Sequence, residues 1–404
     1  MQNKYLFFIN TFNPVIPLYR GLASHWPLEG WKPCFIQSQG NYREYQTDDT
    51  SNIIKKNTKW VWIPAFLRKN KRWCSIFYWV LAPLEIIFAK NLSGCVFLTQ
   101  PPLFYILGTK IARCRKIPYV IHIMDRHPEL LSGVNILKQE SRLYKCLSKM
   151  SINSMKNADG IIAIGRCMKE DLIHQEIDAG KITLVSNWAD DSIYPVEVKD
   201  NIFLKKHDLY NKFVVMYSGN MGLPHKFETI LEVAKNLEKY DKIVFVFIGT
   251  GARRSEVEKA IAAGTDNIQL LDYQPQDLLA HSLSAASVHF ISLKDGFEGI
   301  VVPSKFYGAL ASGRPILYEG NSRGEIARAI QEIGCGEVIE PGNSQQLYEK
   351  ILYYYENSSV TIGDGNRAWN AHNTLYKQEL SLEKYLNALT IYFGKATDKF
   401  SSSS

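Results

Sequence analysis

The segment from residue 294 to residue 316 follows a short apolar run, and its charged residues and glycines are spaced so that they could bind a diphosphate. Pro303 and Ser304 are typical of a helix start, and Gly313 of a helix end. Amide groups at a helix N-terminus bind phosphate. A lysine in the first turn is unfavourable for the helix dipole, which mildly favours a ligand-binding role over a structural one. The expected ligand-binding residues are Gly299, Ile300, Val301, Val302, Ser304 and Lys305.

A glycine-containing turn, Tyr217-Ser-Gly-Asn-Met-Gly222, follows another apolar run and precedes a helical pattern. Its two glycines allow a tight turn whose backbone N–H groups can face an anion. Many strand-to-helix turns contain two glycines, so a purely structural role stays open. The candidate ligand-binding residues are Gly219, Asn220, Met221, Gly222 and Lys226.

In the first half of the chain, polar residues crowd the end of the apolar run Tyr119–Ile123. An apolar loop would suffice for folding there, so the polar residues indicate a site. A buried core histidine is the alternative for His122. Asp125 and Glu129 resemble an acid–base pair of carboxylates in composition only. The candidates are His122, Asp125, Arg126 and Glu129.

Short apolar runs alternate with helical patterns along the chain. Such runs indicate parallel strands covered on both faces, so each half is expected to form a doubly wound α/β domain. Ligands bind at the carboxyl ends of these strands, and the expected site is the cleft between two such domains. The expected strands are Tyr5–Asn10, Cys95–Thr99, Tyr119–Ile123, Gly160–Ile164, Ile182–Val185, Phe213–Ser218, Ile243–Ile248, Ile268–Leu271, Val288–Ile291, Ile316–Tyr318 and Gly336–Ile339.

The domain boundary is expected at a polar stretch, Val196–Asn211, which would link the two halves. The N-terminal domain would cover residues 1–195 and the C-terminal domain residues 196–375. A helix within residues 376–395 is expected to pack back on the N-terminal domain. Residues 396–404 end in four serines and are expected to be disordered.

Composition narrows the class of protein. Of the 404 residues, 46% are hydrophobic and 22% charged, which excludes a disordered, collagenous or coiled-coil chain. The seven cysteines form no Cys-x-x-Cys pair, so we expect reduced thiols, no metal site and no disulfide framework. The N-terminal apolar run lacks a signal-peptide cleavage pattern and is expected to be a buried strand. These features favour a cytoplasmic protein.

A basic and aromatic segment lies between Thr50 and Leu84, with seven basic residues and no acidic residue. The following apolar stretch, Trp73–Ala89, is short for a membrane-spanning helix. One interpretation is that residues 55–89 lie on an anionic membrane surface. A charged loop followed by a buried helix is an equally weighted alternative. Nucleic-acid binding is disfavoured, because the basic residues follow no known nucleic-acid module.

Seven segments carry a resemblance to a known family. They are Val214-Val-Met-Tyr-Ser-Gly-Asn-Met-Gly222, Phe245-Val-Phe-Ile-Gly-Thr-Gly251, Val302-Pro-Ser-Lys-Phe-Tyr-Gly-Ala-Leu-Ala-Ser-Gly-Arg-Pro315, Gly336-Glu-Val-Ile-Glu-Pro-Gly342, Met124–Glu129, Lys156–Ile162 and Ser186–Asp190. On these segments the chain resembles the glycosyltransferases of family four. Its Pro-Ser-Lys motif resembles that of the bacterial branch of this family, which builds O-antigen, capsule and exopolysaccharide.

The resemblance implies the GT-B fold, with two Rossmann-like doubly wound domains facing a central cleft. The second domain would hold a nucleotide-sugar donor, expected to be a UDP-N-acetylhexosamine, as substrate. The first would hold a lipid-linked or saccharide acceptor. Transfer would retain the anomeric configuration and need no metal or other cofactor. The protein would work peripherally on the inner face of the cytoplasmic membrane.

The same resemblance implies roles for individual residues. The loop from Gly219 to Gly222 would face the donor phosphates, with Lys226 near the family's phosphate-binding lysine. Glu298 corresponds loosely to the first glutamate of a Glu-x₇-Glu motif, and Gly308 occupies the place of the second. Asp125 would meet the donor sugar. The expected catalytic residues are Asp125, Glu298 and Lys305.

Two other functions are compatible with this fold. A UDP-sugar 2-epimerase would need a set of acid–base carboxylates and histidines that the sequence does not assemble. A non-catalytic partner in a polysaccharide assembly complex would be consistent with glycine at residue 308. Turnover of a UDP-sugar with an added acceptor separates a transferase from both.

Overall fold

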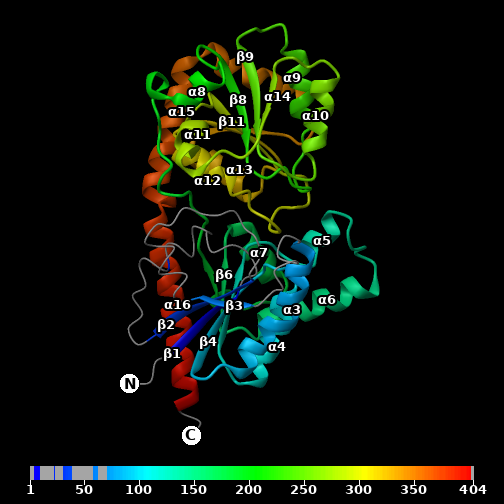
Figure 1. Cartoon of the computed structure of the whole chain (residues 1–404), viewed down its shortest axis with the longest axis vertical. Coiled ribbons are helices and arrows are strands. Elements are labelled where there is room, and N and C mark those ends of the chain that lie inside the picture. The colour runs from blue at the N-terminus through cyan, green and yellow to red at the C-terminus, as the bar shows by residue number, and fades with distance from the viewer. Residues whose placement is uncertain (1–3, 10–21, 23–30, 39–57, 62–70, 402–404) are drawn as a thin grey trace. The chain divides into compact units, whose positions relative to one another are not determined.

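The computed structural model describes residues 4–9, 22, 31–38, 58–61 and 71–401. It divides the chain into two compact units (Figure 1). The first unit comprises Met1–Ser186, Gly299–Val301 and Glu379–Ser404, and the second comprises Asn187–Glu298 and Val302–Gln378. Each unit contains one parallel sheet, as the sequence predicts.

The sheet of the first unit has the strand order β3-β2-β1-β4-β5-β6-β7, and every described pair of neighbours is parallel. Five of these strands match the predicted runs to within a few residues. They are β1 (Lys4–Ile9), β4 (Leu92–Leu98), β5 (Tyr119–Ile123), β6 (Gly160–Ala163) and β7 (Ile182–Leu184). The prediction missed β2 (Trp31–Ser38) and β3 (Thr58–Val61). Lys32 and Pro33 interrupt the apolar run of β2, and β3 has only four residues.

Helices cover both faces of this sheet, because right-handed crossovers between parallel strands reverse sides where the strand order changes direction. Figure 1 shows α3, α4 and α6 on one side of the sheet and α16 on the other. The helices of the first unit are α3 (Lys71–Phe88), α4 (Phe104–Cys114), α5 (Glu129–Gly133), α6 (Arg142–Lys156), α7 (Arg166–His174) and most of α16 (Gln378–Ser401). Among the described helices, none is long and apolar enough to cross a membrane.

The sheet of the second unit has the order β10-β9-β8-β11-β12-β13, again with parallel neighbours. Its strands are β8 (Phe213–Ser218), β9 (Ile243–Ile248), β10 (Ile268–Leu271), β11 (Val288–Ser292), β12 (Ile316–Glu319) and β13 (Gly336–Ile339), all of which were predicted. Its α-helices are α8 (Ile202–Lys206), α9 (Glu228–Asn236), α10 (Arg254–Ala262), α11 (Leu279–Ser284), α12 (Lys305–Ala311), α13 (Glu325–Ile333), α14 (Ser344–Glu356) and α15 (Ser358–Ala371). A buried aromatic and aliphatic core fills the space under α9 and α14.

The linker prediction for Val196–Asn211 is wrong. This stretch forms α8, whose Phe203 and Leu204 are buried in a core with β8 and β9. Polar residues hold the chain before it: the Val196 N–H donates to Ser284 Oγ at 3.0 Å, and Asn201 caps α8. The second unit therefore begins at Asn187, not at residue 196.

The C-terminal helix α16 joins the first unit. Its Tyr392 hydroxyl donates to the Lys181 carbonyl and lies 2.6 Å from the Thr183 hydroxyl. Gly160 of β6 leaves room for the Tyr392 ring, and Gly94 of β4 does the same for Phe393. The prediction of disorder from residue 396 is wrong as far as Ser401, because α16 continues to that residue. Each added residue of a helix gains a further backbone hydrogen bond at no new nucleation cost.

We expect Gly160→Ala to destabilise the first unit by about 1–3 kcal/mol, because the new methyl group would overpack a filled site. It would lie 2.2 Å from the Tyr392 ring, which cannot move without breaking its hydrogen bonds. Gly394→Ala is the matched control in α16, since a Cβ there meets nothing within 4 Å. Urea unfolding followed by circular dichroism checks both variants. Equal stability of the two would contradict the packing described.

Candidate functional site

The carboxyl ends of β8 and β11 lie side by side in the second unit, although six elements separate these strands along the chain. The strand order changes direction between β8 and β11. In open α/β sheets, ligands bind in the crevice that forms at such a point. Two predicted segments meet here: the loop from Gly219 to Gly222, and the loop that leads into α12. The structure thus brings the Gly219 loop and Lys305 to one edge of one sheet.

Glycines shape the first of these loops. Gly219 has φ +129°, and a Cβ on it would lie 3.1 Å from Lys305 Cε, so only glycine lets the lysine approach this closely. The next loop along the sheet, Gly249–Gly251, packs backbone to backbone against it. A Cβ on Gly251 would lie 2.4 Å from the Met221 carbonyl oxygen. The Met221 side chain is fully buried in the core, and its backbone N–H donates to the Thr250 carbonyl at 2.9 Å, so this residue is engaged within the protein.

Lys305 is the cation at the centre of the site. Its Nζ lies 2.9 Å from His225 Nε2 and 4.9 Å from the centre of the Tyr217 ring. Burial lowers the pKa of Lys305 to about 7. Burial, and secondarily the Lys305 charge, lower the pKa of His225 to about 3, so its imidazole is neutral near pH 7. The ammonium group can therefore donate to Nε2 and still offer protons to an anion.

His225 was not among the predicted residues, yet it fixes Lys305. Its Nδ1 lies 2.5 Å from the Ser292 carbonyl oxygen at the end of β11. Arg253 donates to the His225 carbonyl, and the Lys294 N–H donates to the Pro224 carbonyl at 2.9 Å. Four basic side chains thus belong to one neighbourhood: Lys226, Arg253, Lys294 and Lys305. Arg253 also forms ion pairs with Glu228 and Glu256.

Sequence reasoning selected Lys226 and passed over its neighbour. The Lys226 N–H donates to Ser292 Oγ, whose hydroxyl donates back to the Lys226 carbonyl. These bonds set the loop so that His225, not Lys226, faces Lys305. The only sequence signal for His225 was a histidine in a loop already selected for its glycines, and the clamp itself involves residues far along the chain.

The helix start in the second loop differs from the prediction. Ser304 precedes α12 but makes no side-chain cap, and α12 begins at Lys305 and has only seven residues. Its dipole is correspondingly small, so the Lys305 charge itself is the main attraction for an anion. Gly313 has φ +64° and follows the helix, as predicted for its end. Val302 is buried, and Gly299–Val301 are grouped with the first unit.

Glu298 lies in the same loop, half-buried. Its Oε2 accepts the Gly296 N–H at 2.9 Å, while Oε1 is buried and has no hydrogen-bond partner among the described residues. Burial raises its pKa. Gly308 lies in α12, where a Cβ would touch only Leu283 at 3.4 Å, so this position faces α11. A carboxylate with an unused oxygen is suited to accept a hydrogen bond from a ligand hydroxyl.

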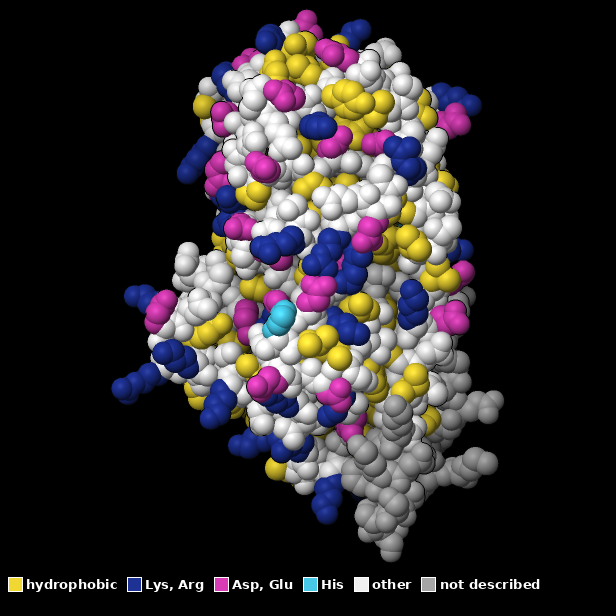
Figure 2. Space-filling model, turned by 180° about the vertical axis from the view of Figure 1, so that it is seen from behind, with side chains coloured by type: hydrophobic (Ala, Val, Ile, Leu, Met, Phe, Trp, Pro, Cys, Tyr) yellow, Lys and Arg dark blue, Asp and Glu magenta, His cyan; other side chains and the backbone are white. Residues whose placement is uncertain are grey.

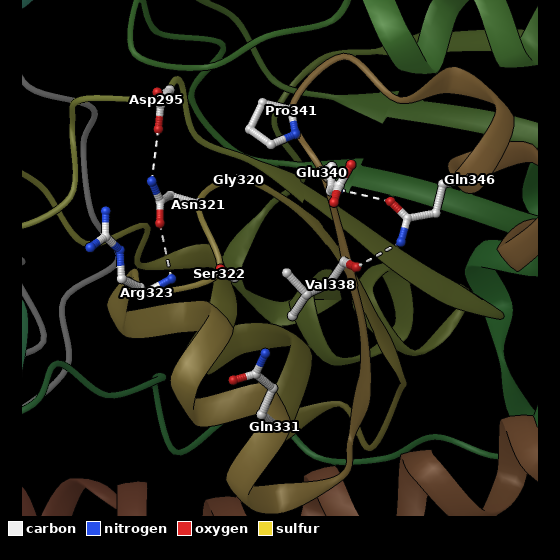
Figure 3. A pocket seen from close by; sticks show the side chains of 10 residues that line it. All are labelled: Asp295, Gly320, Asn321, Ser322, Arg323, Gln331, Val338, Glu340, Pro341 and Gln346. Carbon is white, nitrogen blue, oxygen red and sulfur yellow. Dashed lines mark hydrogen bonds between the residues drawn. The ribbon is translucent and has the colours of Figure 1, made fainter.

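A polar hollow of about 620 Å³ lies at the carboxyl ends of β12 and β13, next to this loop. Figure 3 shows the Asn321 amide between Asp295 and Arg323, and Gln331 standing on α13 below them. The Asn321 Nδ2 donates to Asp295 Oδ1 at 2.9 Å. The hollow is lined by Asp295, Gly320, Asn321, Ser322, Arg323, Gln331, Val338, Glu340, Pro341 and Gln346. Such carboxylates and amides match a ligand rich in hydroxyl groups.

In the first unit, Asp125 lies after β5 with its backbone N–H bound to Thr99 Oγ1. Burial raises its pKa to about 6, and a hydrogen bond from the Gln100 side chain opposes this shift. A carboxyl group with such a pKa can exchange protons near neutral pH. Thr99 and Gln100 follow β4, the neighbouring strand, and were not predicted as part of this cluster.

The other three predicted residues of this cluster are engaged within the protein. Arg126 is almost fully buried and donates to Asp171 at 2.8 Å and to Glu129 at 3.4 Å. Its backbone N–H donates to the Ile300 carbonyl at 2.9 Å. His122 is buried against the Tyr385 ring, and burial lowers its pKa to about 3. The alternative of a neutral core histidine therefore fits His122.

Among the described residues, no group of three or more His, Cys, Asp or Glu side chains could hold a metal ion. The positive charges near the Gly219 loop are all from lysine and arginine side chains.

Comparisons with known proteins agree with this geometry. Residues 212–357 match the family model described as glycosyl transferases group 1. The chain is 30% identical over 305 residues to "Probable glycosyltransferase WbjE" of Pseudomonas aeruginosa, which covers 74% of this chain and 73% of the relative. It is 23% identical over 259 residues to WcaI of Escherichia coli (strain K12), provisionally named a colanic acid biosynthesis glycosyl transferase, which covers 62% and 63%.

Solved structures share the fold. Anabaena Alr3699/HepE in complex with UDP-glucose matches with a TM-score of 0.70 and 13% identity, over 96% of this chain and 99% of that chain.

We expect the Asp125→Asn variant to become more stable relative to the wild type as the pH rises from 4 to 6.5. The raised pKa means that the folded protein holds a proton which the unfolded chain releases, so wild-type stability falls as pH rises through about 6. A difference of roughly two pKa units corresponds to about 3 kcal/mol. Calorimetric unfolding at several pH values measures it, with Glu140→Gln on an exposed loop as control. A pH-independent difference between variant and wild type would refute the buried carboxyl.

Proposed function

Because this chain belongs to the group 1 glycosyltransferases, we propose that it transfers a sugar from a nucleotide-sugar donor to a lipid-linked or saccharide acceptor. The proposed donor is UDP-linked and its sugar an N-acetylhexosamine, and the proposed role is polysaccharide synthesis. The name of WcaI refers to colanic acid biosynthesis, and HepE was solved with UDP-glucose. Both support the choice of substrate class. The fold is GT-B, with two doubly wound units.

The observation that carries this proposal is the Lys305 ammonium behind Gly219. Departure of a nucleoside diphosphate builds negative charge on the β-phosphate. A cation already held by His225 at a strand end stabilises that charge without reorganising. Desolvation strengthens the attraction, because the site excludes part of the water that would screen it.

The proposed reaction retains the anomeric configuration. The acceptor hydroxyl oxygen forms a bond to the sugar C1 on the face that the diphosphate leaves. The bond between C1 and the β-phosphate oxygen breaks, and its electrons go to that oxygen. The hydroxyl proton passes to the departing phosphate, so no protein nucleophile is required. Positive charge that develops on the sugar ring is balanced by the same phosphate.

The sugar itself would be bound by carboxylates. We assign the unused oxygen of Glu298 to a sugar hydroxyl and the polar hollow beside it to the rest of the ring. Asp125 is assigned a second contact with the substrate, and Arg126, Glu129 and His122 the positioning of its loop on the acceptor side. Transfer is proposed to need no metal, because cations of the chain take that role. A lipid-linked acceptor would place the protein at the inner face of the cytoplasmic membrane.

We expect Lys305→Met to lower kcat/KM for a UDP-sugar by about 10²–10³, the usual effect of removing one transition-state donor. Wild-type turnover, measured as UDP release with added acceptor, should survive EDTA. Lys259→Met, on an exposed side chain of α10, is the matched control and should keep full activity. Loss of turnover in EDTA, or full activity of Lys305→Met, would contradict the mechanism. Formation of a free epimer without acceptor would instead indicate an epimerase.

Donor binding should weaken as pH rises through about 7. The Lys305 charge is present below its pKa and lost above it, while a UDP-sugar keeps its charge. The dissociation constant is therefore expected to rise about tenfold between pH 6 and pH 8. Calorimetric titration with the UDP-sugar measures this, and Lys305→Met should show weak, pH-independent binding. A flat profile for the wild type would rule out a titrating lysine at the phosphate.

A further inference from the structure

Three helices of the first unit hold the whole net charge of the protein. Together α3, α4 and α6 contain eight basic residues and one acidic residue, Glu85. The chain as a whole has 47 basic and 40 acidic residues, so the remaining residues have 39 of each. The basic residues of the three helices are Lys71, Arg72, Lys110, Arg113, Arg142, Lys145, Lys149 and Lys156.

The same helices expose apolar side chains to solvent. On α3 the exposed residues recur every three or four positions, which places them along one stripe. Val80 is 62% exposed and Phe88 74%. Among the residues of the three helices whose burial is described, the exposed apolar ones are Ile76, Val80, Leu84, Ile87, Phe88, Leu107, Leu143 and Met150. A soluble surface rarely gathers so many, and a patch rimmed by polar residues marks an interaction site.

These helices form one layer, because α4 packs against α3 on one side and α6 on the other. In Figure 2, basic side chains stand out at the margin where α6 lies, with apolar side chains between them. We call this layer the basic helical face. Between α4 and α6 it contains a hollow of about 260 Å³, lined by Lys110, Arg113, Met150 and four further residues, none of them acidic.

We propose that the basic helical face docks on an anionic lipid bilayer, with the α3 stripe among the upper acyl chains and a lipid headgroup phosphate in the hollow. The proposal rests on the proposed function only in that a lipid-linked acceptor lies in the same membrane. It extends the surface expected from residues 55–89. Of the basic residues in that segment, Lys55, Lys56, Arg68 and Lys69 lie outside the described residues.

The combination of basic and exposed apolar side chains on this face favours an anionic bilayer over other anionic partners. The headgroup region offers negative charge directly beside hydrocarbon, so one surface satisfies both the lysines and the apolar stripe. A nucleic acid would meet the lysines but leave Val80 and Phe88 in water. Lys156 is paired with Glu176 and is left out of the test.

Vesicle sedimentation tests this with the full chain. The probes are vesicles of phosphatidylcholine alone and of equal parts phosphatidylcholine and phosphatidylglycerol. The charge variant is Lys110→Ala/Lys145→Ala/Lys149→Ala, and its control is Lys206→Ala/Lys242→Ala/Lys259→Ala, at exposed lysines of the second unit. The apolar variant is Val80→Ser/Phe88→Ser, and its control is Ile202→Ser/Ile362→Ser, again exposed.

The wild type should bind only the anionic vesicles, and about 0.5 M salt should release it. Each lysine removed from the face should weaken partitioning about fivefold, so the triple variant loses about 100-fold. The apolar variant should lose about tenfold or more. Both controls should bind as the wild type does.

Three results would overturn the proposal: no binding to anionic vesicles in 0.1 M salt, equal losses in face and control variants, or binding that persists in the triple variant. Thermal unfolding of each variant with and without UDP accompanies the assay. A retained UDP shift with no vesicle binding refutes the basic helical face and leaves the transferase intact. Vesicle binding without any UDP shift in the wild type refutes the transferase and supports the face.

Discussion

The site depends on one cation being kept in a partly desolvated place. An ammonium group loses hydration on burial, and this cost appears as the lowered pKa of Lys305. The neutral His225 ring and the Tyr217 face offset only part of this cost. The part of the desolvation cost that is not offset makes the binding of an anion next to Lys305 favourable. Ser292 and Arg253 hold the His225 loop at the edge of the sheet through hydrogen bonds to the imidazole and to the backbone carbonyl.

Much of the fold could be predicted from residue patterns, since a strand buried on both faces needs an uninterrupted apolar run. Strands β5, β8 and β9 match to the residue for this reason. Where burial is partial the pattern fails: β2 includes Lys32 and Pro33, and α8 looked like a linker although Phe203 is buried. The site was harder. Lys305 and Asp125 could be selected from their residue type and their place after a strand. His225 acquires its role through a contact with Ser292, 67 positions away, which the sequence does not reveal.

The two units use their polar residues differently. In the second unit Lys305 donates to His225 and still has protons to offer an anion, and one oxygen of Glu298 is unused among the described residues. In the first, Arg126 is paired with two carboxylates and His122 is buried against the Tyr385 ring, while burial raises the pKa of Asp125. The charge of the first unit lies instead on its outer helices. Binding chemistry and surface chemistry are thus separated within one chain.

The composition of the first unit has a consequence for synthesis on the ribosome. Its sheet is made early, but the ring that fills the space over Gly160 comes from Tyr392, 232 positions later. At the usual speed of translation the gap lasts roughly 10–50 s. Throughout that interval β4 and β6 would present uncovered glycine-lined grooves to the cytosol, while the second unit is completed and folds. A ribosome stalled after the second unit would release a product whose first sheet lacks the cover that Tyr392 and Phe393 of α16 give to Gly160 and Gly94.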